Sequence, residues 1–347
     1  MNRIRTLVNK VGLAPIIIGT LLLLMFVLAP SVGLRIDQSL TDTIVRFGMN
    51  GIMVLGMIPM LQTGCGLNFG LPVGIIAGLL GSTLSIEMGL TGNLGFLCAI
   101  GIAMVFSAIF GWAYGKLLNR VKGYEMMIAT YVGFSAVALM NIMWMVLPYK
   151  SPKMVWGFLG AGLRTTISLD GFWSKNLDNA LAIRIGSSFM FPTGTIIFFV
   201  FMALFMWAFF HTKTGTAMTA VGSNPDYARA SGISIDKMRT ISVIMSTMYG
   251  AIGILIFQQS FGFIQLYNAP FYMALPAVAA ILIGGASVNK ATISNAVIGT
   301  FLFQGLLTMT PAVINAAIQS DISDVVRIIV SDGMILYALT RATRKSR

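Results

Sequence analysis

Long apolar stretches alternate with short polar ones along almost the whole chain. The apolar stretches are about 20 residues long, which is the length that an α-helix needs to cross the hydrocarbon core of a bilayer. This pattern predicts an all-α, polytopic integral membrane protein, with about ten transmembrane helices in one domain over residues 1–347. The expected spans cover about residues 11–30, 43–61, 68–87, 94–116, 124–147, 190–211, 238–258, 271–286, 292–311 and 324–341.

The first apolar stretch has the charge pattern of a signal peptide. Arg3, Arg5 and Lys10 precede it. However, residues 11–30 form a longer apolar run than the core of a typical signal peptide. We therefore interpret this stretch as an uncleaved first span.

A glycine-rich segment interrupts the apolar pattern after the second span. Residues 62–72 read QTGCGLNFGLP. Non-helical backbone at membrane depth is stable only where protein or a water-filled cavity satisfies its polar groups. Residues 63–72 are therefore either a break at membrane depth, beside a cavity or a close helix contact, or a short surface turn. The first interpretation predicts at least one broken helix.

The longest polar segment of the C-terminal half, residues 212–239, contains the signals of a very short helix. Asn224 can cap the free N–H groups, Pro225 suits the first helical position, and Asp226 is favourable in the first turn. Gly232 can supply a left-handed end. A helix of about seven residues is unstable alone in water, because its nucleation costs more than its few hydrogen bonds return. We therefore expect another molecule to pack on it.

Composition agrees with a membrane protein. Hydrophobic residues make up 56% of the chain and charged residues only 10%, against about 25% charged residues in a typical soluble domain. A net charge of +12 would suggest nucleic acid in a soluble protein. Here the basic residues lie between the spans, so we expect contact with the lipid bilayer and no nucleic-acid partner.

The basic residues also predict the orientation. They gather in residues 1–10, 116–122, 213–239 and 341–347, and loops rich in Lys and Arg stay in the cytoplasm. Both termini and the 212–239 segment are therefore predicted to be cytoplasmic. Residues 148–189 then form the largest extracytoplasmic loop, which is either a structured cap or a solvated connector.

The sequence contains no recognisable catalytic or metal site. Cys65 and Cys98 fall in apolar segments, and with the single His211 they make no convincing set of metal ligands. Residues 284–292 partly follow a phosphate-binding loop, but Asn289 replaces its second glycine and Ala291 its Ser/Thr. We therefore expect no enzyme activity and no cofactor, and an ATP-driven process would need a separate ATPase.

An ion gradient is the alternative source of energy, and it would need ionisable groups within the membrane. Asp332 lies well inside the last expected span, and Glu125 lies near the end of another. Asp332 could couple transport to an ion, or it could make a structural contact with a cation such as Arg327. A self-sufficient secondary transporter therefore remains a second hypothesis.

Several motifs together resemble one family of membrane proteins. Thr214-Gly215, the run 222–224 (GSN), the run 228–233 (ARASGI) and Lys237 follow the T-x-x-G, G-x-N and A-x-x-S-G-I pattern with its following lysine. In span order and motifs, residues 10–342 resemble the permease subunits of bacterial ATP-binding-cassette importers for ribose, galactose and related monosaccharides. The same superfamily includes permeases for nucleosides and branched-chain amino acids.

A second motif supports the resemblance, and two departures from it concern the substrate. Residues 279–287, AAILIGGAS, are similar to the family's A-x-x-x-G-G-x-S stretch. Residues 63–70 depart from the family's T-G-G-I-D-L-S-x-G pattern, with an additional residue, Asn in place of Asp and Gly in place of Ser. The glycine-rich tail after Ser287 is also missing. The architecture is unaffected by these changes, whereas the substrate could differ.

The resemblance implies a multi-pass subunit of the bacterial inner membrane that imports a sugar. Residues 212–239 would be the coupling segment that docks on ATP-binding subunits, through Asn224, Pro225, Tyr227, Ala228, Arg229, Ala230, Ser231, Gly232 and Lys237. A solute-binding protein would dock on the opposite face, and a second permease, identical or homologous, would complete the pathway. Alternative solutes are a nucleoside or another small polar molecule. Polar residues near span ends are pathway candidates, namely Gln62, Asn68, Gln258 and Gln259.

Overall fold

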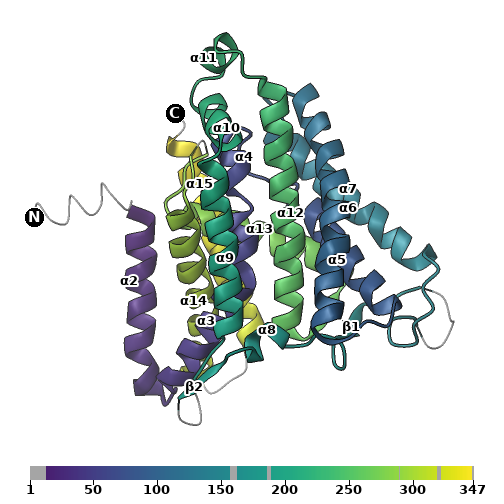
Figure 1. Cartoon of the computed structure of the whole chain (residues 1–347). Helices are drawn as coiled ribbons and strands as arrows, with labels where there is room; N and C mark the ends of the chain where they lie inside the picture. Colours follow the sequence, from purple (N-terminus) through teal and green to yellow (C-terminus); the bar gives the residue numbers. More distant parts are fainter. Residues whose placement is uncertain (1–12, 157–161, 186–188, 289, 319–321, 346–347) are drawn as a thin grey trace, which may run out of the picture.

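The structure, a computed structural model, is a bundle of helices that run side by side along one axis (Figure 1). It describes residues 13–156, 162–185, 189–288, 290–318 and 322–345. The basic residues Arg3, Arg5 and Lys10, and also Asn289, lie outside the described residues. The large helices of the bundle are α2 (Leu13–Leu28), α3 (Ile36–Leu55), α5 (Leu71–Glu87), α6 (Gly92–Arg120), α7 (Glu125–Val146), α9 (Thr193–Phe210), α12 (Ile235–Phe261), α13 (Ala269–Ile283), α14 (Ile293–Ile318) and α15 (Ser323–Lys345).

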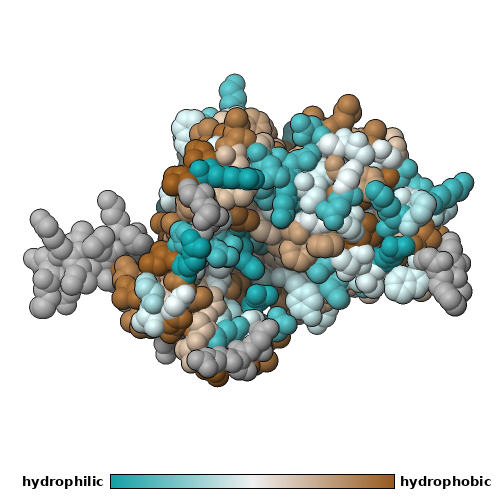
Figure 2. All heavy atoms as spheres, turned by 90° about the horizontal axis from the view of Figure 1, so that it is seen from below, coloured by the Kyte–Doolittle hydropathy of each residue, from teal (hydrophilic) through white to brown (hydrophobic). Residues whose placement is uncertain are grey.

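Short elements connect these helices at the two ends of the bundle. At one end lie α4 (Ile58–Gln62), α10 (Lys213–Ser223) and α11 (Pro225–Ala230), and α11 projects furthest from the body (Figure 1). The opposite end carries η1 (Ala29–Val32), α8 (Asn176–Asn179), β1 (Thr166–Ser168), β2 (Ile183–Ile185), β3 (Phe189–Phe191) and β4 (Phe263–Gln265). Polar residues cover much of that end (Figure 2).

The helical membrane class is confirmed, and the expected number of spans is not. Within the described residues, seven helices are long and apolar enough to cross a membrane, including Ile36–Gln62, which contains α3 and α4. Two more, α5 and α13, are apolar but shorter. The last expected span coincides with α15, which is not among the seven. Its charged residues Asp324, Arg327 and Asp332 lower its hydropathy.

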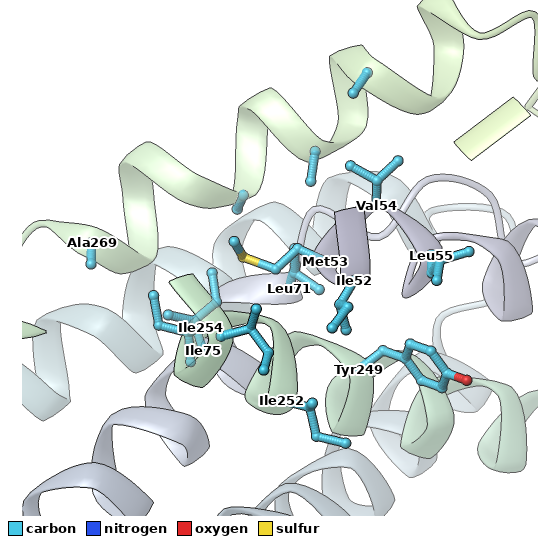
Figure 3. Packing of buried hydrophobic residues seen from close by; sticks show 14 of the residues in the cluster. Ile52, Met53, Val54, Leu55, Leu71, Ile75, Tyr249, Ile252, Ile254 and Ala269 are labelled. Carbon is cyan, nitrogen blue, oxygen red and sulfur yellow. The ribbon is translucent and has the colours of Figure 1, made fainter. Parts of the chain in front are cut away.

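The core of the bundle is built around α12. Most of its length is buried against α3, α5 and α6, and Met53, Leu71 and Ile254 pack together there (Figure 3). Gly74 and Gly78 of α5 permit a very close approach. A Cβ atom on Gly74 would lie 3.0 Å from the Thr247 Cα, and one on Gly78 would lie 2.5 Å from the Ala251 carbonyl oxygen. The fourfold spacing of these glycines thus serves packing within the chain.

The described part of the 148–189 loop packs on the bundle as a cap. Strand β1 pairs antiparallel with β4, with Thr166 opposite Gln265, and Trp173 is fully buried. The Glu87 carboxylate at the end of α5 accepts hydrogen bonds from the backbone N–H groups of Lys150 and Ser151, at 2.9 and 3.1 Å. The start and the middle of the loop are therefore fixed to the body.

Tyr149 strengthens the attachment of this cap. Its hydroxyl lies 2.9 Å from the Thr83 hydroxyl. Burial raises the pKa of Tyr149, and the nearby Glu87 carboxylate adds to this effect, while the hydrogen bond with Thr83 opposes it. Tyr149 therefore stays neutral at physiological pH and keeps its hydrogen bond to α5.

Candidate functional site

The short helix in the polar segment forms where the sequence predicts it. Helix α11 covers Pro225–Ala230, with proline in its first turn. The Asn224 side-chain oxygen accepts a hydrogen bond of 3.0 Å from the Tyr227 N–H, and Gly232 ends the segment with φ of 79°. Each local signal in the sequence therefore has its expected structural role.

The chain itself packs on one face of this helix, while the expectation that another molecule also packs on it stays a prediction. Ala228 is fully buried. It belongs to a small apolar cluster with Met218 and Val221 of α10 and Met238 of α12. Tertiary packing of one face supplies the stability that such a short helix lacks alone. The sequence argument missed this cluster because α10 was not expected as a helix.

The rest of α11 faces outward. Tyr227 is 68% exposed, and the exposed Arg229 side chain makes only a long ion pair of 3.9 Å with Asp226. The remaining exposed residues of the expected docking set are Asn224, Pro225, Ala230, Ser231, Gly232 and Lys237. A small buried face and a broad free face give a rigid projection that another protein can contact.

The base of this projection touches the break between α4 and α5. A Cβ atom on Gly222, at the end of α10, would lie 3.0 Å from the Gly64 N and closer still to the Gln62 carbonyl oxygen. A Cβ atom on Gly64, where φ is 72°, would lie 3.4 Å from the Gly222 Cα. Backbone meets backbone here, so displacement of α10 must also displace the break.

The break itself is buried within the protein rather than being a surface turn. All its residues between Thr63 and Gly70 are buried except Gly64 and Phe69. Helix α12 satisfies much of its polarity: the Thr63 hydroxyl donates to the Ser242 hydroxyl at 2.8 Å, and the Asn68 amide donates to the Ser246 hydroxyl at 2.7 Å. Protein groups therefore stabilise this irregular backbone, as the interior of a membrane requires.

A buried ion pair lies beside the break. The Arg239 guanidinium of α12 binds the Glu125 carboxylate at the start of α7, and their side chains are only 9% and 14% exposed. The Arg239 Nε also donates to the Cys65 sulfur at 3.2 Å. Arg239 thus joins α12, α7 and the break, and it is the last residue of the polar segment that carries α11.

The four pathway candidates lie at two separate places. Gln62 donates to the Ala291 carbonyl at 2.5 Å, and Asn68 accepts from the Tyr114 hydroxyl at 3.1 Å. Gln258 accepts from the Ser82 hydroxyl at 2.5 Å, and its buried Nε2 has no partner within the described structure. Asn68 contacts α12 at Ser246, and Gln258 lies on α12 about 18 Å further along the helix, at about 1.5 Å per residue. The structure therefore does not unite these candidates in one site.

Gln259 belongs to a buried polar cluster that the sequence did not reveal. The Asp178 carboxylate, on α8 in the cap, accepts hydrogen bonds from the Thr195 hydroxyl, from Gln259 Nε2 at 3.1 Å and from the Ser260 hydroxyl at 2.8 Å. Asp178 is only 4% exposed. The sequence around Asp178 does not indicate this burial, because the partners of the carboxylate lie on two other helices, α9 and α12.

Asp332, the acid considered for ion coupling, does not form the suggested contact with Arg327. Arg327 pairs with Asp324 at 3.8 Å, one turn away, and not with Asp332. The Asp332 residue is exposed on α15. By contrast Arg46, which the sequence placed near a span end, lies well inside α3, within electrostatic reach of Asp42 and Arg327.

These features define a class: a multi-pass helical membrane protein, with an irregular break in its core and an exposed helical projection at one end. Comparison with known families gives a more specific answer. Residues 39–336 match the family described as the permease component of the branched-chain amino acid transport system. The chain belongs to this family, and the resemblance inferred from its motifs is confirmed.

Similar curated proteins are permeases of import systems. The autoinducer 2 import system permease protein LsrC of Enterobacter sp. (strain 638) is 24% identical over 288 residues, 77% of each chain. The galactose/methyl galactoside import permease protein MglC of Escherichia coli K12 is 26% identical over 278 residues, 78% of this chain and 76% of the relative. The ribose import permease protein RbsC of the same strain is 24% identical over 269 residues, which are 76% of this chain and 75% of the relative. No solved structure matches the chain.

Proposed function

We propose that this chain is the transmembrane subunit of an ATP-binding-cassette importer for a monosaccharide. The observation that carries the proposal is the exposed α11 projection, whose base lies against the break in the core. Such a projection can receive a movement from a partner and pass it to the transport pathway. The names of similar proteins, import permeases for galactose and ribose, support a sugar as the solute.

The partners follow from this function. ATP-binding subunits would dock on residues 212–239 from the cytoplasm, and a solute-binding protein would dock on the cap formed by residues 148–189. Two permease subunits, identical or homologous, would enclose the pathway in the bacterial inner membrane. Both termini would be cytoplasmic. The helices α5, α13 and α15 would complete about ten spans beside the seven that are both long and apolar enough to cross a membrane.

Coupling would proceed from α11 to the core. ATP binding would draw the two ATPases together and move α11, and α10 would transmit that movement to the break through Gly222 and Gly64. Arg239 would carry the same movement to α7 through its ion pair with Glu125. The pathway would then alternate between outward and inward opening, without any catalytic group in this chain.

The test is purification from native membranes in mild detergent, with measurement of ATPase activity and sugar uptake. Arg229→Glu and Tyr227→Ala change exposed positions of α11 and should reduce the recovery of the ATPase strongly. Arg184→Glu reverses an exposed charge on β2 at the opposite end and should leave that recovery unchanged. Uptake by the purified chain alone, without any ATPase, would instead identify a self-sufficient transporter.

A further inference from the structure

A pocket with an aromatic lining lies beside the break, separate from α11 and from the cap. Its volume is about 310 Å³, which is within the usual range of small-molecule sites, roughly 300–1,000 Å³. Three elements form its wall: the break with the start of α5, the first half of α7, and the start of α13. The lining residues are Phe69, Pro72, Thr130, Phe134, Asn268, Phe271, Tyr272, Ala274 and Leu275.

Two of the helices that line the pocket are short. Helix α5 has 17 residues and α13 has 15, so at about 1.5 Å per residue they are shorter than the hydrocarbon core of about 30 Å. Both begin at this pocket, one in each half of the chain. Paired short segments in the two halves of a transporter mark its substrate site in many transporters.

The break holds the Phe69 ring at the pocket. Asn68, the preceding residue, is fixed by its hydrogen bonds with Ser246 and Tyr114. Gly133 lets α7 approach closely, since a Cβ atom there would lie 3.0 Å from the Phe69 carbonyl oxygen. Phe69 is therefore fixed to the break, which is the segment that Gly222 contacts.

The lining combines aromatic faces with free polar groups. The Phe134 and Phe271 rings lie with centroids 5.1 Å apart at an angle of 31°. Tyr272 is 71% exposed and offers a phenol. Asn268 is exposed at the start of α13 and does not cap that helix with its side chain. Lipid chains do not require such polar groups, whereas a polar solute does.

We propose that this pocket binds the transported monosaccharide on its way through the membrane. The apolar C–H face of a pyranose or furanose ring stacks on Phe134 and Phe271, while the Asn268 amide and the Tyr272 hydroxyl bind sugar hydroxyls. This inference rests on the proposed import function. It adds a site that lies in the permease itself, where movement of the break opens or closes one wall.

The first experiment measures protection of the pocket in the reconstituted complex of permease, ATPase and binding protein. Thr130→Cys places a thiol in the pocket lining, and Ser135→Cys places one on the same helix outside it. D-Galactose and D-ribose at millimolar concentration should slow the reaction of a water-soluble maleimide with the first thiol severalfold. They should not slow the reaction of the second, and the unsubstituted complex gives the background from Cys65 and Cys98.

The second experiment measures sugar uptake per ATP hydrolysed. Phe134→Ala and Asn268→Ala should lower this ratio about tenfold, as expected when one stacking or hydrogen-bonding contact is lost. Phe134→Tyr keeps the aromatic face and should retain most of the sugar uptake per ATP hydrolysed. Phe205→Ala removes a similarly exposed ring from α9, a helix that contributes no residue to the pocket lining, and should have no effect.

The outcomes separate the two proposals. Unchanged labelling of Thr130→Cys together with unchanged uptake in the pocket variants would refute the sugar site, while sugar-stimulated ATPase activity would leave the import function intact. Labelling of Thr130→Cys only by a lipid-soluble maleimide would show that lipid fills the pocket, which also refutes the site. A wild-type complex without uptake or stimulated ATPase activity for any sugar would overturn both proposals.

Discussion

Gly222 at the end of α10 and Gly64 in the break between α4 and α5 are in backbone contact, since a Cβ atom on Gly222 would lie 3.0 Å from the Gly64 N. Gly222 stands two residues before Asn224, which caps α11. Gly64 stands at the start of the irregular segment in the core. The exposed projection and the break are therefore mechanically joined without any intervening side chain.

The first prediction concerns this contact. Gly222→Ala should lower the free energy of unfolding of the complex by about 1–3 kcal/mol, because the methyl group meets rigid backbone. It should also reduce uptake more than ATPase activity, because the two ends of the contact are pushed apart. Thermal unfolding in detergent and transport assays measure these effects. Gly101→Ala on α6 is the control, since a Cβ atom there meets no atom within 4 Å.

The buried ion pair gives the second prediction. Glu125→Gln leaves the Arg239 charge buried without its partner, which should destabilise the protein by about 3–5 kcal/mol. Lys122→Ala is a matched control, since it removes an exposed ion pair of 2.6 Å with Asp236 and should cost at most about 1 kcal/mol. Equal shifts in the melting temperatures of the two variants would show that the Arg239 pair does not hold α7 to α12.

The cap provides a third prediction. Asp178→Ala removes the acceptor shared by Thr195, Gln259 and Ser260. Gln259 Nε2 can still donate to the two hydroxyl oxygens, but the buried Thr195 and Ser260 hydroxyls lose their acceptor, at a cost of about 1–3 kcal/mol for each unsatisfied group. Limited proteolysis should then cut residues 162–185 more readily. Asp170→Ala, at an exposed acid of the same loop, should leave the proteolysis rate unchanged.

A fourth prediction concerns the cap of α11. Asn224→Ala removes the hydrogen bond to the Tyr227 N–H and should destabilise the segment by about 1 kcal/mol. Gly232→Ala forces a side chain into φ of 79°, at a cost of about 1 kcal/mol. Both variants should exchange the amide hydrogens of α11 faster, whereas Ser231→Ala should not. Unaltered exchange would mean that α11 depends on its partner and not on its cap.

Much of the membrane architecture could be predicted from the sequence, because apolar length directly reflects the thickness of a bilayer. A helix occupies each of the expected spans, although α3 begins at Ile36, several residues before the expected residue 43. Asp37 and Asp42 reduced the hydropathy of that first part. Local signals also predicted α11, since caps and turns depend on only a few neighbouring residues.

Features that depend on distant contacts could not be predicted in the same way. The pairing of β1 with β4 joins two loops far apart in the sequence, and α10 contains glycine and threonine, which are weak helix formers. The aromatic pocket likewise combines Phe69, Phe134 and Phe271 from three segments. No local pattern marks these residues, because Phe134 and Phe271 resemble ordinary core or lipid-facing residues of their helices and Phe69 lies in the break.

We propose that an ATPase in another subunit drives this chain by contacting and moving α11. Site-specific photo-cross-linking in native membranes tests it most directly, with a photoreactive phenylalanine analogue at Tyr227 on α11 and, in a second sample, at Arg184 on β2. If ATP-binding subunits dock on α11, the analogue at position 227 should cross-link to an ATP-binding subunit and the analogue at position 184 should not. Capture of the ATPase at Arg184, with none at Tyr227, would contradict it.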